Sequence, residues 1–161
     1  MSHGNTGRRV AFIIGLIAAL IIIHGVFSPW FHWEKSIAYF SPISLGQASG
    51  WDLATSDVSF GGSDITQERS IMPLLALGGG ILSVLSAVGG LFTANRFLGI
   101  TLALGGILTL VGLGASMSGE IAHYHVFEGY NEYIKNGTGL IECGIAAFIT
   151  IFTGIFAIRR F

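Results

Sequence analysis

Four long apolar runs, separated by segments that are short or rich in polar residues, set the pattern of the chain. They occupy about residues 10–27, 71–92, 97–117 and 140–158. A helix crosses a bilayer with roughly 20 mostly apolar residues, at about 1.5 Å per residue. The pattern therefore predicts an all-α integral membrane protein in which residues 1–161 form one four-helix transmembrane domain.

The first run has a competing interpretation as a secretory signal peptide, because Arg8 and Arg9 precede it. The run is long for the apolar region of such a peptide, and no small-x-small cleavage site follows it. We therefore expect it to be retained as a membrane span.

The basic residues are distributed unequally about these runs. Five of the eight, Arg8, Arg9, Arg96, Arg159 and Arg160, lie in the two tails and in the turn between the second and third runs. Every Asp and Glu lies in the other two loops or at the ends of the runs beside them. Short cytoplasmic segments carry the excess of Lys and Arg in membrane proteins. We therefore expect a multi-pass protein of the cell membrane with both termini in the cytoplasm.

The first of the two outer loops, residues 28–70, is long enough to fold. Polar and apolar residues alternate towards Phe60 and precede Gly61-Gly62, as in a strand that ends at a hairpin turn. We expect a small antiparallel sheet over about residues 51–66, with an irregular loop as the alternative. Aromatic residues of this loop are expected at the membrane surface or in contact with partners: Trp30, Trp33 and Trp51.

The second outer loop, residues 118–139, is polar and aromatic, and we expect the third helix to continue into it beyond the bilayer. Near its end, Asn136-Gly137-Thr138 matches the acceptor pattern for N-glycosylation, although such a match is often unused. Glu120 and His123 have the spacing of two metal ligands on one helix face, and His125 lies nearby. Carboxylate-bridged sites need that motif twice, and haem histidines should face each other inside a bundle. We therefore predict no metal and no other cofactor.

Trp30 and the later Gly50-Trp51-Asp52-Leu53 are similar to the first-loop tryptophan and the Gly-Leu-Trp element of the claudin-like tetraspan family. The layout also resembles that family across the whole chain, with internal ends, a large first outer loop and a smaller second one. The resemblance implies a four-helix bundle with a small extracellular β-containing loop domain between helices 1 and 2. The family's pair of first-loop cysteines is absent, because Cys143 is the only cysteine.

Two ionisable residues lie inside the apolar runs, where such groups are costly and are functional candidates. His24 is near the outer end of the first run, and Glu142 is about one turn below the outer surface in the fourth. We expect a hydrogen bond between them that clasps two helices; a protonated Glu142 bonded to a backbone carbonyl is a variant of this structural role. A proton or cation site is the alternative, but a transport path needs polar groups throughout the bilayer, and the inner halves of the runs are apolar.

Small residues recur every four positions in three of the runs and predict close contacts between helices. We expect the ridge in the second run to be internal, because a tight turn makes the second and third helices neighbours. The ridge in the first run is then expected to face neighbouring protomers. The ridges are Ala11, Gly15 and Ala19 in the first run, Gly79, Ser83 and Ala87 in the second, and Gly112 and Ser116 in the third.

Composition and charge narrow the function. Charged residues make up 11% of the chain, and a net charge of -1 without a basic cluster argues against a nucleic-acid partner. No nucleophile with a base and no phosphate-binding loop can be assembled, so we expect a protein that is not an enzyme. We predict lateral assembly among membrane lipids, as a homo-oligomer or a small structural subunit of a larger complex that presents its first outer loop to partners. The alternative is an accessory subunit of a transporter, channel or membrane redox enzyme that uses His24, Glu142 and the His123/His125 cluster.

Overall fold

Four long helices dominate the structure of the protein. The computed structural model describes residues 3–35, 43–55, 58–60, 63–65, 70–93, 95–123 and 132–159. The helices are α1 (His3–Phe27), α3 (Met72–Phe92), α4 (Arg96–His123) and α5 (Thr138–Arg159). Each contains a stretch of 21 or 22 residues that is apolar enough to cross a bilayer, which confirms the predicted four-span architecture.

The boundaries of α3 and α4 follow from local chemistry. Pro73 lies in the first turn of α3, where its missing N–H has no partner to lose. At the other end Thr93 is extended, and its backbone N–H and Oγ1 both donate to the carbonyl oxygen of Gly89, each over 2.9 Å. The side-chain oxygen of Asn95 accepts from the N–H of Phe97 at 2.9 Å and caps α4. These contacts produce the tight turn that makes the two helices antiparallel neighbours.

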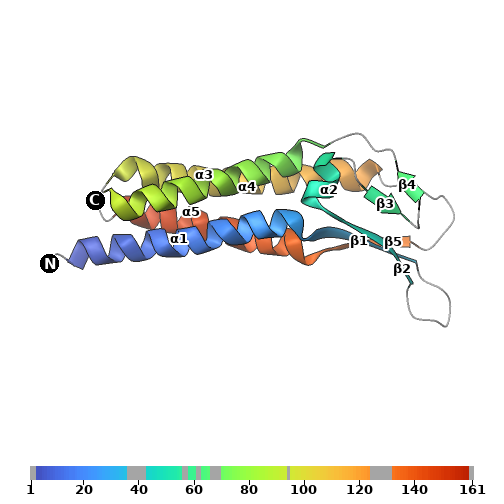
Figure 1. Ribbon diagram of the computed structural model, residues 1–161, viewed down its shortest axis with the longest axis horizontal. Helices are drawn as coiled ribbons and strands as arrows, with labels where there is room; N and C mark the ends of the chain where they lie inside the picture. The colour runs from blue at the N-terminus through green and yellow to red at the C-terminus, as the bar shows by residue number, and fades with distance from the viewer. Residues whose placement is uncertain are drawn as a thin grey trace.

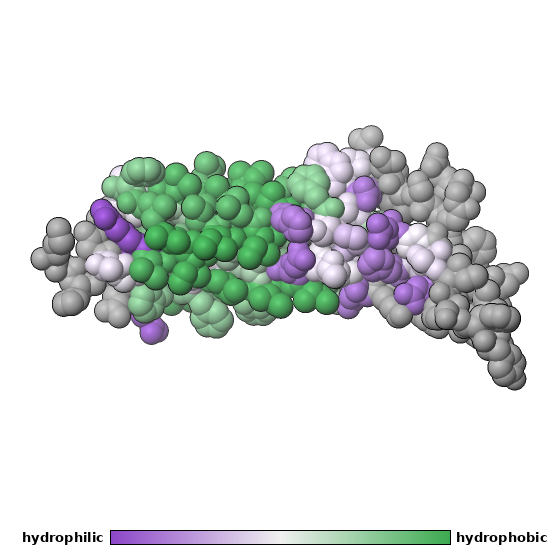
Figure 2. Space-filling view, turned by 60° about the horizontal axis from the view of Figure 1, so that its bottom comes forward, coloured by the Kyte–Doolittle hydropathy of each residue, from purple (hydrophilic) through white to green (hydrophobic). Residues whose placement is uncertain are grey.

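The helices form a bundle in which α1 and α4 each pack against both α3 and α5 (Figure 1). The two described chain ends lie at one end of the bundle, and the strands lie at the other. Large apolar side chains cover the visible face of the helices, with polar residues gathered towards both ends of that face (Figure 2). An apolar exterior suits lipid, because a helix satisfies its backbone hydrogen bonds internally and needs no polar face.

All eight small residues of the predicted ridges are buried, including the three on α1. A methyl group on Gly15 would lie 2.8 Å from Leu102 Cδ2 of α4 and 3.2 Å from Thr153 Oγ1 of α5. Ala11 is in the same core cluster as Leu102, and Ala19 is fully buried. The prediction that this ridge faces neighbouring protomers is therefore wrong. Each helix of this bundle contacts two others closely, so α1 needs small residues for internal packing as much as α3 does.

At the end of the bundle opposite the chain termini lies a layer of strands from both loops, which we call the outer layer because we expected these loops outside the membrane. Its three-stranded antiparallel sheet has the order β2-β1-β5, with Trp33 of β1 opposite Gly46 of β2 and Ile134 of β5. A separate two-stranded hairpin pairs β3 with β4. This hairpin confirms the small antiparallel sheet that we expected there, whereas the three-stranded sheet, which includes a strand from the second loop, was not predicted. The strands are β1 (Pro29–Lys35), β2 (Ile43–Ser49), β3 (Val58–Phe60), β4 (Ser63–Ile65) and β5 (Glu132–Asn136).

A short helix, α2 (Gly50–Thr55), occupies the start of the stretch 51–66, in which we expected strands alone. Ser49 and Asp52 explain the difference, because Asp52 Oδ2 accepts from the N–H and the hydroxyl of Ser49, each at 2.8 Å. Ser49 Oγ in turn accepts from the N–H of Asp52 at 3.1 Å. This reciprocal arrangement is a capping box, which starts a helix. Strand β3 follows α2, as expected.

Candidate functional site

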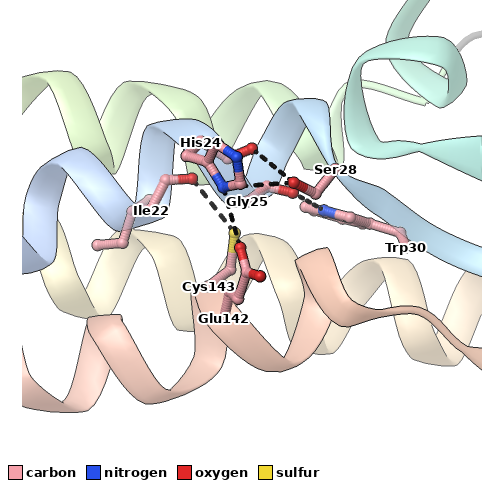
Figure 3. Close-up of polar contacts among 7 residues, drawn as sticks. All are labelled: Ile22, His24, Gly25, Ser28, Trp30, Glu142 and Cys143. Atoms are coloured by element: carbon pink, nitrogen blue, oxygen red, sulfur yellow. Dashed lines mark hydrogen bonds and ion pairs between the residues drawn. The ribbon is translucent and has the colours of Figure 1, made fainter.

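The outer end of the α1–α5 contact holds the one ionisable pair predicted from the sequence. His24 in the last turn of α1 and Glu142 in α5 point towards each other, with His24 Nδ1 3.0 Å from Glu142 Oε2 (Figure 3). Ser28 extends the contact, because its hydroxyl donates to the carbonyl oxygen of His24 at 3.1 Å and lies 3.4 Å from Nδ1. The structure thus brings His24 and Glu142 together, as we expected from their similar depth in the membrane.

The pair lies on the periphery of the bundle and not in its interior. The side chain of His24 is 73% exposed and that of Glu142 is 38% exposed. Within the described part of the chain, no three His, Cys, Asp or Glu side chains are grouped closely enough to hold a metal ion. An imidazole and a carboxylate at the rim, without a third ligand, form a hydrogen-bonded clasp between two helices.

Close backbone contact behind the pair sets its geometry. A methyl group on Gly139 would overlap the carbonyl oxygen of Gly25, and one on Gly25 would lie 2.6 Å from Cys143 Sγ. The thiol of Cys143 donates to the carbonyl oxygen of Ile22 at 3.3 Å (Figure 3). Helices α1 and α5 therefore meet backbone to backbone at this level. We did not predict this crossing, although Gly139 and Cys143 are small residues four positions apart, which is the spacing of such contacts.

Trp30 connects the outer layer to the bundle from the same place. Its side chain is fully buried, and its indole N–H donates to the carbonyl oxygen of Gly25 at 2.9 Å. Gly50, at the start of α2, lies against the indole ring, because a methyl group there would be 2.7 Å from Cε2. Trp30 thus touches α1 and α2 while belonging to β1.

The three tryptophans of the first loop do not share one role. Trp33 is 5% exposed and, like Trp30, belongs to the core cluster beneath the sheet. The prediction that these two side chains contact partners is wrong, because β1 turns them back over the end of the bundle. Trp51 is 40% exposed, and its ring centroid is 5.4 Å from that of Phe27. Of the three, Trp51 is available for contact at the membrane surface.

The remaining candidates lie in or near the second outer loop. Asn136 is exposed at the end of β5, opposite Phe31 of β1, and the predicted glycosylation pattern ends at Thr138, where α5 begins. The backbone of Glu120 and His123 belongs to α4, but their side chains lie outside what the structure describes, and so does the whole of His125. That these residues hold no metal therefore stays a prediction.

The clasp leads to a test of its stabilising role. Replacing Glu142 with leucine is expected to lower the free energy of unfolding by about 0.6 kcal/mol, the average for a hydrogen bond between membrane helices. The loss is small because both side chains are partly exposed. Glu142→Gln retains an acceptor for the imidazole and should keep most of the stability.

A double-mutant cycle provides the control, since it isolates the interaction between the two side chains. His24→Leu, Glu142→Leu and the double variant would be unfolded in the same detergent. A coupling free energy indistinguishable from zero would show that the clasp contributes nothing.

No protein-family model matches the chain, and no curated protein matches its sequence.

Proposed function

We propose that this multi-pass membrane protein has no catalytic role and assembles laterally, with copies of itself or as a small structural subunit of a larger complex, through its outer layer. The observation that supports this best is the joining of both outer loops in one sheet. Strand β5 pairs with β1 along five residue pairs, although the two strands come from different loops. Such a layer presents a defined surface to a partner.

The connection between the outer layer and the bundle supports the same proposal. Trp30 and Trp33 are buried at the junction, and Leu53 of α2 is in the same cluster. A surface held this firmly loses little conformational freedom on binding, which favours affinity. Trp51 is exposed on α2. Tryptophan is one of the residue types enriched among the few residues that contribute most of the binding energy at protein interfaces.

The bundle interior does not favour the alternative, an accessory subunit that moves protons, ions or electrons. Among the described residues, the buried polar side chains of the four long helices are serine and threonine hydroxyls. Three of them donate to a carbonyl oxygen one turn earlier in their own helix, at 2.7–3.0 Å. The His24–Glu142 pair is at the rim, so it does not extend this set into a polar path.

The proposal includes an orientation and an architectural likeness. We place the end of the bundle that carries the chain termini in the cytoplasm of a cell, because four of the described basic residues gather there: Arg8, Arg9, Arg96 and Arg159. The outer layer then faces the exterior. A large first outer loop built partly of strands supports the likeness of layout to claudin-like tetraspan proteins.

A single labelling experiment tests both the orientation and the assembly. Thr55 is exposed on α2, one turn after Trp51, so Thr55→Cys places a thiol beside the proposed contact surface. In intact cells a membrane-impermeant reagent with a maleimide at one end and a photoreactive diazirine at the other should react with this thiol. On illumination it should link the chain to a second copy, giving a product of twice the mass, or to another partner, giving a mass that adds that partner. The native Cys143 is buried and should give little background.

Arg96→Cys, at the opposite end of the bundle, is the matched control and should react after the cells are opened. Reaction of Arg96→Cys in intact cells, with Thr55→Cys silent, would reverse the orientation. Reaction of Thr55→Cys without any linked product, across reagents of several lengths, would contradict assembly through the outer layer.

A further inference from the structure

A groove runs between α1 and α5 at the end of the bundle that carries the chain termini, far from the His24–Glu142 pair. Its volume is about 520 Å³, within the range of about 300–1,000 Å³ typical of ligand sites. Small residues line it on both helices: Gly7, Ala11 and Thr153. Larger apolar side chains also line it, including Ile14, 43% exposed, and Phe152, 68% exposed. The groove is therefore a hollow in a lipid-facing surface.

The chemistry of the groove changes at the end of the helices. Most of its lining is hydrocarbon, but Arg159, in the last turn of α5 and exposed, is also part of it. Arg8 and Arg9 follow Gly7 on α1. The sequence contains no Asp or Glu before Glu34 or after Glu142, so these two helix ends carry positive charge without an acidic residue of their own. An occupant that fits has an apolar chain and an anionic head.

We propose that this groove binds one anionic phospholipid, with an acyl chain along the apolar lining and the phosphate at Arg159. A guanidinium group suits this role because its planar set of donors can bind two phosphate oxygens at once. Basic residues close to a membrane surface also attract anionic headgroups. The proposal requires the ends of α1 and α5 to lie at one face of the bilayer, whichever face that is, and it does not depend on the proposed assembly.

A second copy of the chain is the less suitable occupant. In a symmetric pair the same surface of both copies meets, so the groove of one copy would bring its Arg159 towards that of the other. Like charges at such a contact oppose association. An anionic headgroup neutralises the same arginines.

Native mass spectrometry of the full-length protein in mild detergent tests the proposal with phosphatidylglycerol and phosphatidylcholine of identical acyl chains. We expect one phosphatidylglycerol to be retained in preference to phosphatidylcholine. Arg159→Gln should reduce this preference about fivefold, as expected for the loss of one basic residue near a headgroup. Arg96→Gln, at the same end of the bundle but outside the groove lining, should leave it unchanged.

A second pair of variants tests the groove itself. Ile14→Trp should fill the groove and abolish retention of the lipid, whereas Ile81→Trp, at a position on α3 with a similar exposed fraction of 46%, should not. Both positions face lipid, so both variants are expected to fold, which their thermal melting would verify. Equal retention of the two lipids, equal effects of the two arginine variants, or full retention by Ile14→Trp would each overturn the proposal. So would a bound mass equal to a second chain that Ile14→Trp removes.

Discussion

Replacing Gly79 with leucine is expected to destabilise the bundle strongly, whereas the same replacement at the adjacent Gly78 should leave it intact. A methyl group on Gly79 would overlap the carbonyl oxygen of Gly105 and lie 2.5 Å from Thr109 Oγ1, both on α4. These are backbone and buried atoms of the neighbouring helix, which cannot move aside without separating α3 from α4. At Gly78 no atom of a neighbouring element lies within 4 Å of the added methyl group.

We expect Gly79→Leu to lose about 3 kcal/mol of stability or more, the upper range for overpacking a tight contact. Thermal unfolding followed by circular dichroism in one detergent would compare both variants with the wild type. Leucine has a better helix propensity than glycine, so Gly78→Leu should melt at or above the wild-type temperature. Equal melting of the two variants would show that the α3–α4 crossing does not depend on close approach at Gly79.

The four spans could be predicted because each depends on a local property, a run of roughly 20 apolar residues that a bilayer accepts as a helix. The tight turn between α3 and α4 was equally local. The pairing of β1 with β5 was not, since it joins Trp33 to Ile134, residues 101 positions apart, and nothing in either segment specifies the other as its partner. The capping box of Ser49 and Asp52 was visible in the sequence, but we used only the alternation of polar and apolar residues that follows it, which predicts the strand ending at Phe60 and not the helix before it.

For the candidate site, the pairing of its two residues could be predicted from the sequence, but their exposure could not. His24 and Glu142 could be paired from their depth in the membrane alone, because an unpaired polar group there is costly. The exposure of the two side chains depends on how each helix is rotated about its axis. That rotation is set by which small residues lie in the contacts between helices. With a ridge on α1 and another on α3, the sequence did not say which one faced lipid, and the structure buries both.

For the tryptophans, too, the sequence did not say which side chains are buried. Replacing the buried Trp30 gives the second prediction of a large loss of stability. Trp30→Ala is expected to lower the free energy of unfolding by about 3–5 kcal/mol, as for other buried large side chains cut back to alanine. The loss comes from a cavity between β1 and the bundle and from the hydrogen bond to Gly25. Trp30→Phe keeps most of the volume and should recover all but about 0.5–1.5 kcal/mol, the net contribution of one hydrogen bond. The carbonyl oxygen of Gly25 keeps a partner in this variant, because the N–H of Ser28 also donates to it at 3.2 Å.

Trp51→Ala is the matched control for this prediction, because it removes the same side chain from a site that is 40% exposed. It should cost no more than about 1 kcal/mol, chiefly the aromatic contact with Phe27.

Thermal unfolding would give the stabilities of both variants, and amide hydrogen exchange would show which elements each replacement destabilises. In Trp30→Ala we expect faster exchange in β1 and β5 while the centres of α3 and α4 stay protected, because the tryptophan joins the sheet to the bundle without forming part of the inner helix contacts. Uniform loss of protection would mean that Trp30 supports the whole bundle, and equal losses of stability in the two alanine variants would show that its burial does not anchor the outer layer.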